Sequence, residues 1–240
     1  MLFSNCYRRL PQRTFVNTRV NITFDAGTPG FFMKIIPVES GYDQFASSYY
    51  KQYQHLDSFD WVEIKEILFS IVDIIFSKES DLVKIGDFGC GDGRILKRLI
   101  NYISSKGYSN FQITAIDISE KMLKIAKKKL RDNVNFIKIN LEKERSKEIF
   151  NLIYSFFLLV HIKDIELFFY NVKNNLKNNG IFIFNNIEQK KGFKLPFLKE
   201  EVYIEFYNHT DNKVYELVSR YFSHLKIIRT NFSTIFVCEK

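Results

Sequence analysis

The sequence predicts a doubly wound α/β domain built on a mainly parallel sheet. Between residues 82 and 185, short apolar strand-like runs alternate with amphipathic helix-like segments, which is typical of a parallel sheet with helices on both faces. The final strand-like runs, 224–229 and 232–238, lie too close together for a crossover helix and are expected to pair antiparallel. The 240-residue chain is long enough for one such domain of roughly 200 residues.

Local signals bound the individual elements. Ser119 is a good N-cap for a helix that runs to about residue 131. Asn178, Asn179 and Gly180 are expected to end the helix 163–177, because Asn and Gly tolerate the left-handed conformation. The other expected helices are 42–54, 60–76, 92–104 and 211–222, and the other expected strands are 82–87, 111–116, 134–139, 150–155, 181–185 and 202–206.

Residues 1–40 differ from the rest and are expected to be a non-core extension ahead of a domain spanning 41–240. Four arginines, Arg8, Arg9, Arg13 and Arg19, precede the first acid, Asp25, and no clear period is visible. This composition fits an organelle-targeting presequence, a leader ahead of a start at Met33, or a flexible arm.

The net charge of +8 has two interpretations. It fits an RNA or other polyanionic partner, or lysines that cover solvated helix faces. The second reading is favoured, because the basic residues from 121 to 131 alternate with apolar ones at helical spacing. Cys6, Cys90 and Cys238 are far apart without zinc spacing, so a cytoplasmic protein without a metal site is expected. The longest apolar run, 152–160, is far shorter than the roughly 20 residues that span a bilayer.

The most informative pattern is the stretch from residue 83 to residue 94. A β-branched apolar run ends at Asp87, glycines follow at 89, 91 and 93, and a helical pattern then begins. Such glycines allow a sharp strand-to-helix turn and a close approach of a ligand to the main chain. The spacing does not match G-x-G-x-x-G, and no Gly-Lys-Ser/Thr follows, so neither a dinucleotide nor a nucleoside triphosphate is the expected ligand.

This stretch resembles motif I of the class I S-adenosylmethionine-dependent methyltransferases, acid-x-Gly-x-Gly-x-Gly. The resemblance implies a Rossmann-like seven-stranded sheet of order 3-2-1-4-5-7-6 with the last strand antiparallel, preceded by N-terminal lid helices. It implies S-adenosyl-L-methionine as cofactor, with its methionine moiety on the Gly loop and its amino group near Asp87. The implied cofactor-binding residues are Asp87, Gly89, Cys90, Gly91, Gly93, Asp117, Ile118, Met122, Asn140, Leu141, Phe156, Tyr42 and Tyr49.

Four of these positions also have ordinary structural explanations; for Asp117, an acid that ends a strand is often only a turn or cap residue. Asp117 falls where the family places an acid on the ribose hydroxyls, and a carboxylate can accept two hydrogen bonds from them. Ile118 and Met122 fit the faces of the adenine but equally fit a hydrophobic core. Asn140 stands where the family usually has an acid near the adenine amino group, and it is also a common turn residue.

Two further segments carry the resemblance. The stretch from Phe150 to Asp164 resembles the strand-four region of small-molecule methyltransferases, and Tyr42-Asp43-x-x-Ala46-x-x-Tyr49 resembles their lid helix. His161 and His209 are the candidate general bases, although a lone His is more often structural or exposed. The strand-four loop lacks the Asn/Asp-Pro-Pro-Tyr/Phe of adenine methylases and the Pro-Cys of cytosine methylases.

The expected function is therefore methyl transfer to a small molecule by in-line displacement. The expected acceptor wall is aromatic, which favours an apolar or planar acceptor, and core packing explains part of the same set: Phe156, Phe157, Phe193, Phe197, Tyr203, Phe206 and Tyr207. An RNA or protein methyltransferase remains an alternative because of the net charge. A non-catalytic methyltransferase-like partner subunit is a third possibility, since Asn140, Asn151 and Asn178-Asn179 depart from the family pattern.

Overall fold

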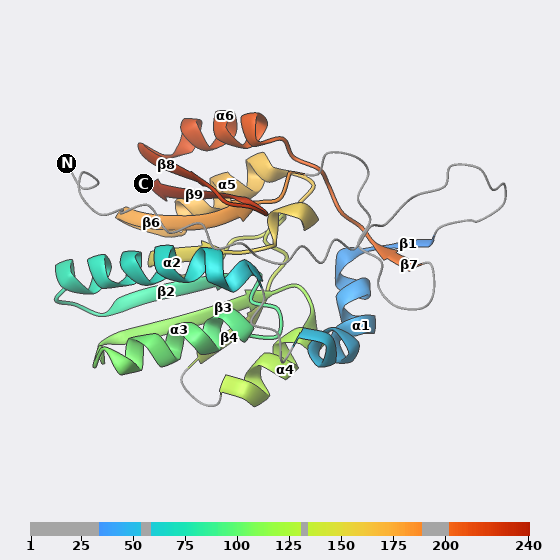
Figure 1. Ribbon diagram of the computed structural model, residues 1–240, viewed down its shortest axis with the longest axis horizontal. Helices are drawn as coiled ribbons and strands as arrows, with labels where there is room; N and C mark the ends of the chain where they lie inside the picture. Colours follow the sequence, from blue (N-terminus) through green and yellow to red (C-terminus); the bar gives the residue numbers. More distant parts are fainter. Residues whose placement is uncertain (1–33, 54–58, 131–133, 189–201) are drawn as a thin grey trace. The chain divides into compact units, whose positions relative to one another are not determined.

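The computed structural model describes residues 34–53, 59–130, 134–188 and 202–240. Its main strands are β2 (Val83–Phe88), β3 (Phe111–Asp117), β4 (Val134–Lys138), β5 (Phe150–Ser155), β6 (Leu176–Asn186), β8 (His224–Arg229) and β9 (Thr234–Glu239). They form a seven-stranded sheet in the order β4-β3-β2-β5-β6-β9-β8 (Figure 1). In this sheet β9 alone runs opposite to the other strands. The predicted fold class, strand order and antiparallel last strand are confirmed.

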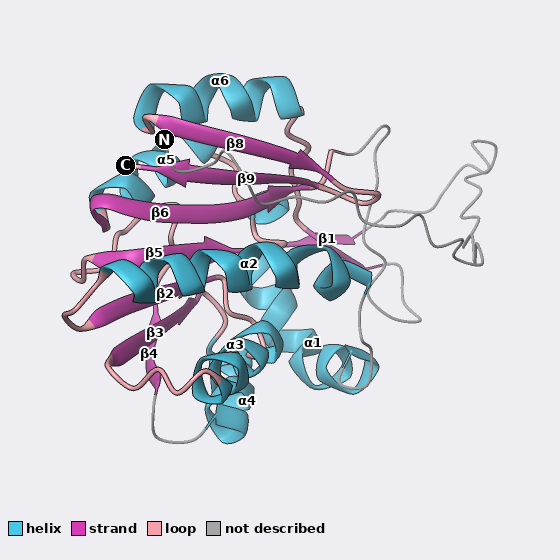
Figure 2. Ribbon diagram, turned by 60° about the vertical axis from the view of Figure 1, so that its left-hand side comes forward, coloured by secondary structure: helices cyan, strands magenta, loops and turns pink. Residues whose placement is uncertain are grey.

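Helices cover both faces of the sheet (Figure 2). The helices are α1 (Val38–Tyr53), α2 (Phe59–Lys78), α3 (Arg94–Ser105), α4 (Glu120–Leu130), α5 (Ile165–Asn174) and α6 (Asp211–Tyr221). One hydrophobic cluster joins α2, α3 and α4 to the sheet, and a second joins α5 and α6 to it. Among the described residues, no helix is long and apolar enough to cross a membrane.

The boundary between α5 and β6 differs from the prediction. The helix ends at Asn174, and pairing with β5 already begins at Leu176, opposite Phe150. The register then shifts, so that Leu152 faces Ile181. The intervening residues form a bulge, in which Asn179 has a φ of 60°. The Asn-Asn-Gly sequence therefore serves a left-handed turn within the strand rather than a helix cap.

A small two-stranded sheet was missed from the sequence. Strand β1 (Lys34–Ile36) pairs in parallel with β7 (Val202–Ile204), far away in the chain. Helix α1 follows directly, and Ile36, Phe45 and Ile204 form a small cluster of their own. Residues 34–36 and 38–40 thus belong to β1 and α1, while residues 1–33 lie outside the described residues. The division of the chain at residue 40 stays a prediction.

Gly93 is a packing residue at the start of α3. Its φ is 74°, and an added Cβ would lie 2.9 Å from Leu130 Cδ1 and 3.1 Å from Ala126 Cβ. Gly107, after the same helix, has a similar φ of 73°, but nothing lies within 4 Å of an added Cβ. The two positions share the backbone strain and differ only in packing.

We expect Gly107→Ala to lower the free energy of unfolding by about 1–2 kcal/mol, the cost of a left-handed non-glycine residue. Gly93→Ala should cost a further ~1–3 kcal/mol, because its methyl group must displace the α4 contact. Urea unfolding of both variants measures the difference. Equal losses would show that Gly93 is required for backbone conformation alone.

Candidate active site

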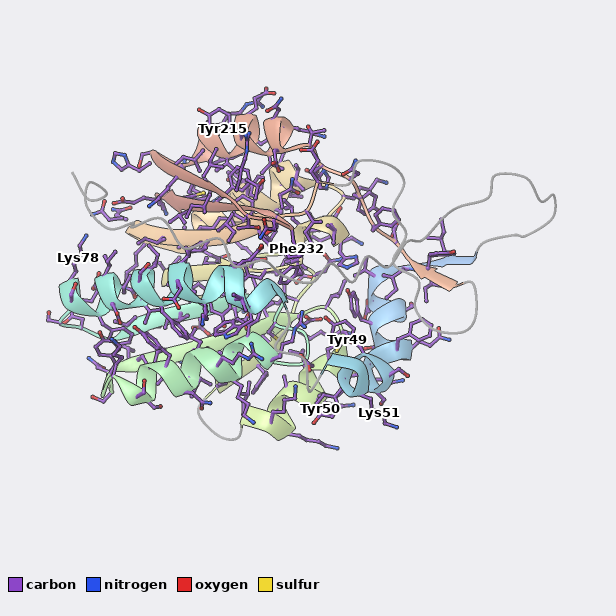
Figure 3. All side chains as sticks on the ribbon, in the orientation of Figure 1. Tyr49, Tyr50, Lys51, Lys78, Tyr215 and Phe232 are labelled. Atoms are coloured by element: carbon purple, nitrogen blue, oxygen red, sulfur yellow. The ribbon has the colours of Figure 1, made fainter. Side chains whose placement is uncertain are left out.

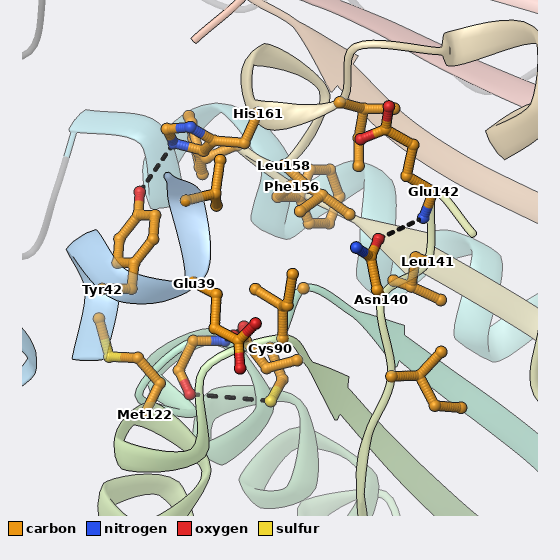
Figure 4. Close-up of a pocket in the computed structure, with 18 of the residues that line it drawn as sticks. Glu39, Tyr42, Cys90, Met122, Asn140, Leu141, Glu142, Phe156, Leu158 and His161 are labelled. Carbon is orange, nitrogen blue, oxygen red and sulfur yellow. Dashed lines mark hydrogen bonds between the residues drawn. The ribbon is translucent and has the colours of Figure 1, made fainter. Parts of the chain in front are cut away.

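The loops after four parallel strands meet at a cavity of about 450 Å³ at the carboxyl edge of the sheet. Ligand sites in proteins commonly enclose roughly 300–1,000 Å³. The walls come from the Gly loop after β2, the turn after β3, residues 139–143 after β4 and residues 156–163 after β5. Helix α1 and residues 205–207 complete the wall, and Figure 4 shows the side chains that face the space. This is the position where open α/β sheets bind ligands.

Asp117 joins two of these loops and the lid helix α1. Its Oδ2 accepts a hydrogen bond from the Gly91 N–H at 2.8 Å, and its Oδ1 accepts one from the Ser119 N–H at 2.9 Å. Ser119 caps α4, as predicted, because its Oγ accepts the Met122 N–H at 3.2 Å. The Ser119 hydroxyl also donates to Asp43 of α1 at 2.6 Å. The acid, the Gly loop and α1 therefore hold one another in place.

The Gly loop leaves room beside Gly91. This glycine has a φ of 53°, lines the cavity, and would meet nothing within 4 Å if it carried a Cβ. A side chain there would occupy space on the cavity side, where a ligand can approach the main chain. Gly89 and Cys90 line the same wall. Burial raises the pKa of the Cys90 thiol, so this thiol stays protonated and is a poor nucleophile.

Two buried carboxyl groups make the cavity favourable for a cation. Burial raises the pKa of Asp87 to about 8, with the Asp117 charge adding to the effect and the Tyr154 hydroxyl opposing it. Burial also raises the pKa of Asp117 to about 6, against the backbone N–H groups that it accepts. Among the described residues, Asp87 Oδ2 has no hydrogen-bond partner. A cationic ligand would compensate both groups.

The predicted adenine side of the cavity is formed mainly by apolar residues. Ile118, Met122, Asn140 and Leu141 all line it, together with Ile139, which the sequence reading missed. Asn140 Oδ1 accepts the Glu142 N–H at 3.1 Å, so this side chain also makes the turn that its residue type suggested (Figure 4). A ring bound here would lie between aliphatic side chains near one amide.

His161 is held in a defined tautomer on the opposite side. Its Nδ1 lies 3.0 Å from the Glu205 carbonyl oxygen, which can only accept, so Nδ1 carries the proton. Nε2 is therefore the acceptor, and the Tyr42 hydroxyl donates to it at 2.8 Å (Figure 4). Burial lowers the pKa of His161. The ring is thus a neutral base at the cavity wall, in contact with the lid helix.

Most, but not all, of the predicted site residues meet at the cavity. Tyr42, Tyr49, Asp87, Phe156 and His161 line it along with the residues described above. Gly93 is outside the lining, because it faces α4. His209 is also outside: it is buried, and its Nε2 bonds to the Ile162 carbonyl at 2.8 Å.

The aromatic acceptor wall is present in part. Phe156, Phe157 and Tyr207 line the cavity, Tyr203 and Phe206 do not, and Phe193 and Phe197 lie outside the described residues. The sequence reading missed Glu39, Arg94 and Glu205 as lining residues. Of these three residues, only Arg94 could have been predicted from the sequence to line the cavity, because it directly follows the Gly loop.

The sheet order, the Gly loop and the acid after β3 together define a class I methyltransferase fold. A family model described as a methyltransferase domain matches residues 79–221, more than half of the chain. The chain therefore belongs to this methyltransferase family. The resemblance drawn from the sequence is confirmed, and S-adenosylmethionine is the cofactor that goes with it.

Two curated relatives illustrate the similarity. The ubiquinone biosynthesis O-methyltransferase of Rickettsia canadensis (strain McKiel) is 26% identical over 137 residues, 55% of this chain and 55% of that protein. The malonyl-[acyl-carrier protein] O-methyltransferase of Bacillus cytotoxicus is 28% identical over 145 residues, 60% of this chain and 45% of that protein. The chain thus spans about half the length of the curated relatives it matches.

Solved structures share the fold at low sequence identity. DhpI in complex with S-adenosylhomocysteine has a TM-score of 0.61 at 15% identity, covering 84% of this chain and 94% of that one. The magnesium protoporphyrin IX methyltransferase of Synechocystis PCC 6803 with bound S-adenosylmethionine has a TM-score of 0.58 at 13% identity, covering 85% and 95%.

The hydrogen bonds of His161 predict its titration. We expect the neutral Nδ1–H tautomer at pH 6.5, because burial lowers the pKa of the ring. In Tyr42→Phe the pKa should rise, since the lost hydroxyl stabilises only the form in which Nε2 is unprotonated. Imidazole ¹⁵N–¹H correlation spectra across pH 5–8 measure both, with Tyr49→Phe as the control on the same helix. A charged ring at pH 6.5 in the unmodified protein would contradict the assignment.

Proposed function

We propose that this chain binds S-adenosylmethionine in the cavity and transfers its methyl group to an oxygen of a small organic molecule. The observation that carries the proposal is the Asp117 carboxylate, bonded to the N–H groups of Gly91 and Ser119 at the cavity wall. A carboxylate held in this way would be a fixed acceptor for vicinal hydroxyls, and it lies beside a glycine that leaves the main chain open.

The residues present fit each part of the cofactor. Asp87, with its unpartnered Oδ2, would hold the ammonium group, and Gly91 would allow the amino acid part to lie against the main chain. Asp117 has lone pairs left for the ribose hydroxyls after accepting its two N–H groups. Met122 and Leu141 would contact the adenine, and the Asn140 amide would lie near its edge.

The bound cofactor supplies an activated methyl group with a neutral leaving group. What the chain must add is alignment of the acceptor, exclusion of water and, for a hydroxyl acceptor, a place for the proton. His161 is neutral, and its Nε2 can take that proton when the Tyr42 hydroxyl yields the position or passes the proton on. The Glu205 carbonyl then keeps the ring in place by accepting from Nδ1–H throughout.

Two observations support a small oxygen acceptor. The acceptor side of the cavity combines the apolar and aromatic side chains of Phe156 and Leu158 with two hydrogen-bonded polar pairs, Tyr42–His161 and Tyr207–Glu205. The two relatives with 26% and 28% identity are named as O-methyltransferases. The lining of this cavity is explained without a groove of aromatic and basic side chains for RNA, and without a strand edge that would bind a peptide.

Cofactor binding is tested by calorimetry with S-adenosylhomocysteine. We expect Gly91→Ala and Asp117→Ala each to weaken binding at least about tenfold, through a blocked approach and a lost ribose acceptor respectively. Gly107→Ala carries the same kind of backbone strain away from the cavity and should bind normally. Thermal unfolding of each variant separates lost binding from lost folding. Unchanged binding in Asp117→Ala would remove the central observation of the proposal.

Methyl transfer is tested by incubating the protein with methyl-labelled S-adenosylmethionine and fractions of a cell extract. We expect label in the small-molecule fraction, and His161→Gln should slow transfer by roughly 10²–10⁴-fold while still binding S-adenosylhomocysteine. Label confined to RNA or protein would replace the proposal with the macromolecular alternative that the charge of +8 suggested. Cofactor binding without transfer to any fraction would identify a non-catalytic subunit.

A further inference from the structure

Glu205 and Tyr207 form a hydrogen-bonded pair on the wall of the cavity. Both residues are half-buried and line the cavity on the side of His161. The Tyr207 hydroxyl donates to Glu205 Oε1 at 2.5 Å. The proton transfer described above does not use this carboxylate, because His161 is held by the main-chain carbonyl of Glu205. The carboxylate therefore has no role yet in the chemistry of the site.

The main chain around the pair is fixed from two directions. The Glu205 N–H donates to the Ile36 carbonyl of β1 at 2.9 Å, and the Glu205 carbonyl accepts from His161 Nδ1 at 3.0 Å. The Tyr207 N–H donates to the Val160 carbonyl, in the loop after β5, at 2.7 Å. Groups whose backbone is held in this way lose little conformational freedom when a ligand binds.

Tyr207 keeps its proton and orients the carboxylate. Burial raises the pKa of Tyr207 to about 12, and the hydrogen bond to Glu205 and the charges of Glu205 and Glu142 add to the effect. The hydroxyl is therefore a donor at neutral pH, and it uses one of the about four lone-pair positions of the Glu205 carboxylate. The remaining positions are suited to a ligand donor.

No lysine or arginine in the described part of the chain forms an ion pair with Glu205. The other two glutamates of the lining have different partners. Glu39 pairs with Lys138 at 2.6 Å, and Glu142 Oε1 accepts the Asp164 N–H at 3.0 Å. The charge of Glu205 is thus met by a neutral hydroxyl, and a ligand cation would compensate it better.

The basic residues of the lining leave this charge in place. Arg94 lies on the Gly-loop side, where its central carbon is 6.0 Å from the centre of the Tyr49 ring. Tyr49 projects from α1 toward the body of the domain (Figure 3). Lys143 and Lys163 are exposed on the loops after β4 and β5, where solvent and salt screen their charges.

We propose that Glu205, oriented by Tyr207, binds an ammonium group of the methyl acceptor. The proposal rests on the proposed function and extends it from the reacting oxygen to a second group of the same molecule. Because the Glu205 carbonyl contacts His161, the reacting hydroxyl and the ammonium would lie on one side of the cavity. An ammonium gains charge-assisted hydrogen bonds from the carboxylate, whereas an acidic group in the same place is repelled. The pair would therefore select amino-bearing acceptors over acidic ones of the same size.

Three probes with the same ring and different charges test this selection: benzylammonium, benzyl alcohol and benzoate. Each is titrated by calorimetry into the protein saturated with S-adenosylhomocysteine. Glu205→Gln removes the charge and keeps the main-chain contact with His161, and Tyr207→Phe removes the orienting hydroxyl. Glu144→Gln is the matched control, because Glu144 is exposed and lies outside the cavity lining.

We expect the unmodified protein to bind benzylammonium at least about tenfold more tightly than benzyl alcohol, and benzoate most weakly. Glu205→Gln should remove this preference, Tyr207→Phe should reduce it, and Glu144→Gln should preserve it. The affinity for S-adenosylhomocysteine and the imidazole spectrum of His161 should be unchanged in Glu205→Gln, which separates a lost ammonium site from a disturbed fold. If Glu205→Gln does not fold, the order of the probes on the unmodified protein and on Tyr207→Phe decides.

Three results overturn the proposal: a preference that survives in Glu205→Gln, tighter binding of benzoate than of benzylammonium, or binding of none of the probes by a protein that binds S-adenosylhomocysteine. In each of these cases the proposed function still stands. If the unmodified protein does not bind S-adenosylhomocysteine, the proposed function itself fails.

Discussion

The hydrogen bonds of Asp117 are the constraint on which the rest of the site depends. The carboxylate ends β3 and accepts N–H groups from the Gly loop and from the start of α4. Because β2 and β3 are paired in register up to Phe88 and Ile116, the sheet delivers both loops to the same point. Ser119 then passes the constraint to Asp43 and so to the lid helix. One acid thus sets the spacing of three separate chain segments.

The site buries two carboxyl groups in a position where burial disfavours their charged forms. Asp87 and Asp117 are both buried, and the pKa of each is raised, to about 8 and about 6. At neutral pH the pair therefore holds less negative charge than two exposed carboxyls would. A ligand cation lowers both pKa values again, so binding energy and charge recovery are coupled. Asp87 Oδ2 is buried and has no hydrogen-bond partner among the described residues, so the free-energy cost of burying this carboxyl is not compensated there.

The sequence predicted most of the elements and the residues nearest the strand ends, because both follow from local signals. Periodicity locates strands and helices, and parallel strands bring the residues after their carboxyl ends together, as for Asp87 and Asp117. The sheet order came from the family resemblance, since alternation alone does not specify it. The β1–β7 pair and the Glu205 carbonyl on His161 join segments with large separation and no periodic signal. The bulge before Ile181 was also missed, because Asn-Asn-Gly suits a helix cap and a strand turn equally well.

The lid helix α1 connects the two halves of the site. Toward the β3 side, Asp43 accepts the Ser119 hydroxyl and the Lys121 N–H, which fixes α1 to the start of α4. Toward the β5 side, Tyr42, the residue before Asp43, donates a hydrogen bond to His161. Two adjacent residues of α1 therefore contact both halves of the site. Asp43 contacts Ser119, which supports Asp117, and Tyr42 contacts the expected base, His161. Because Tyr42 and Asp43 are neighbours on α1, the orientation of His161 and the support of the loop that fixes Asp117 depend on the same placement of this helix.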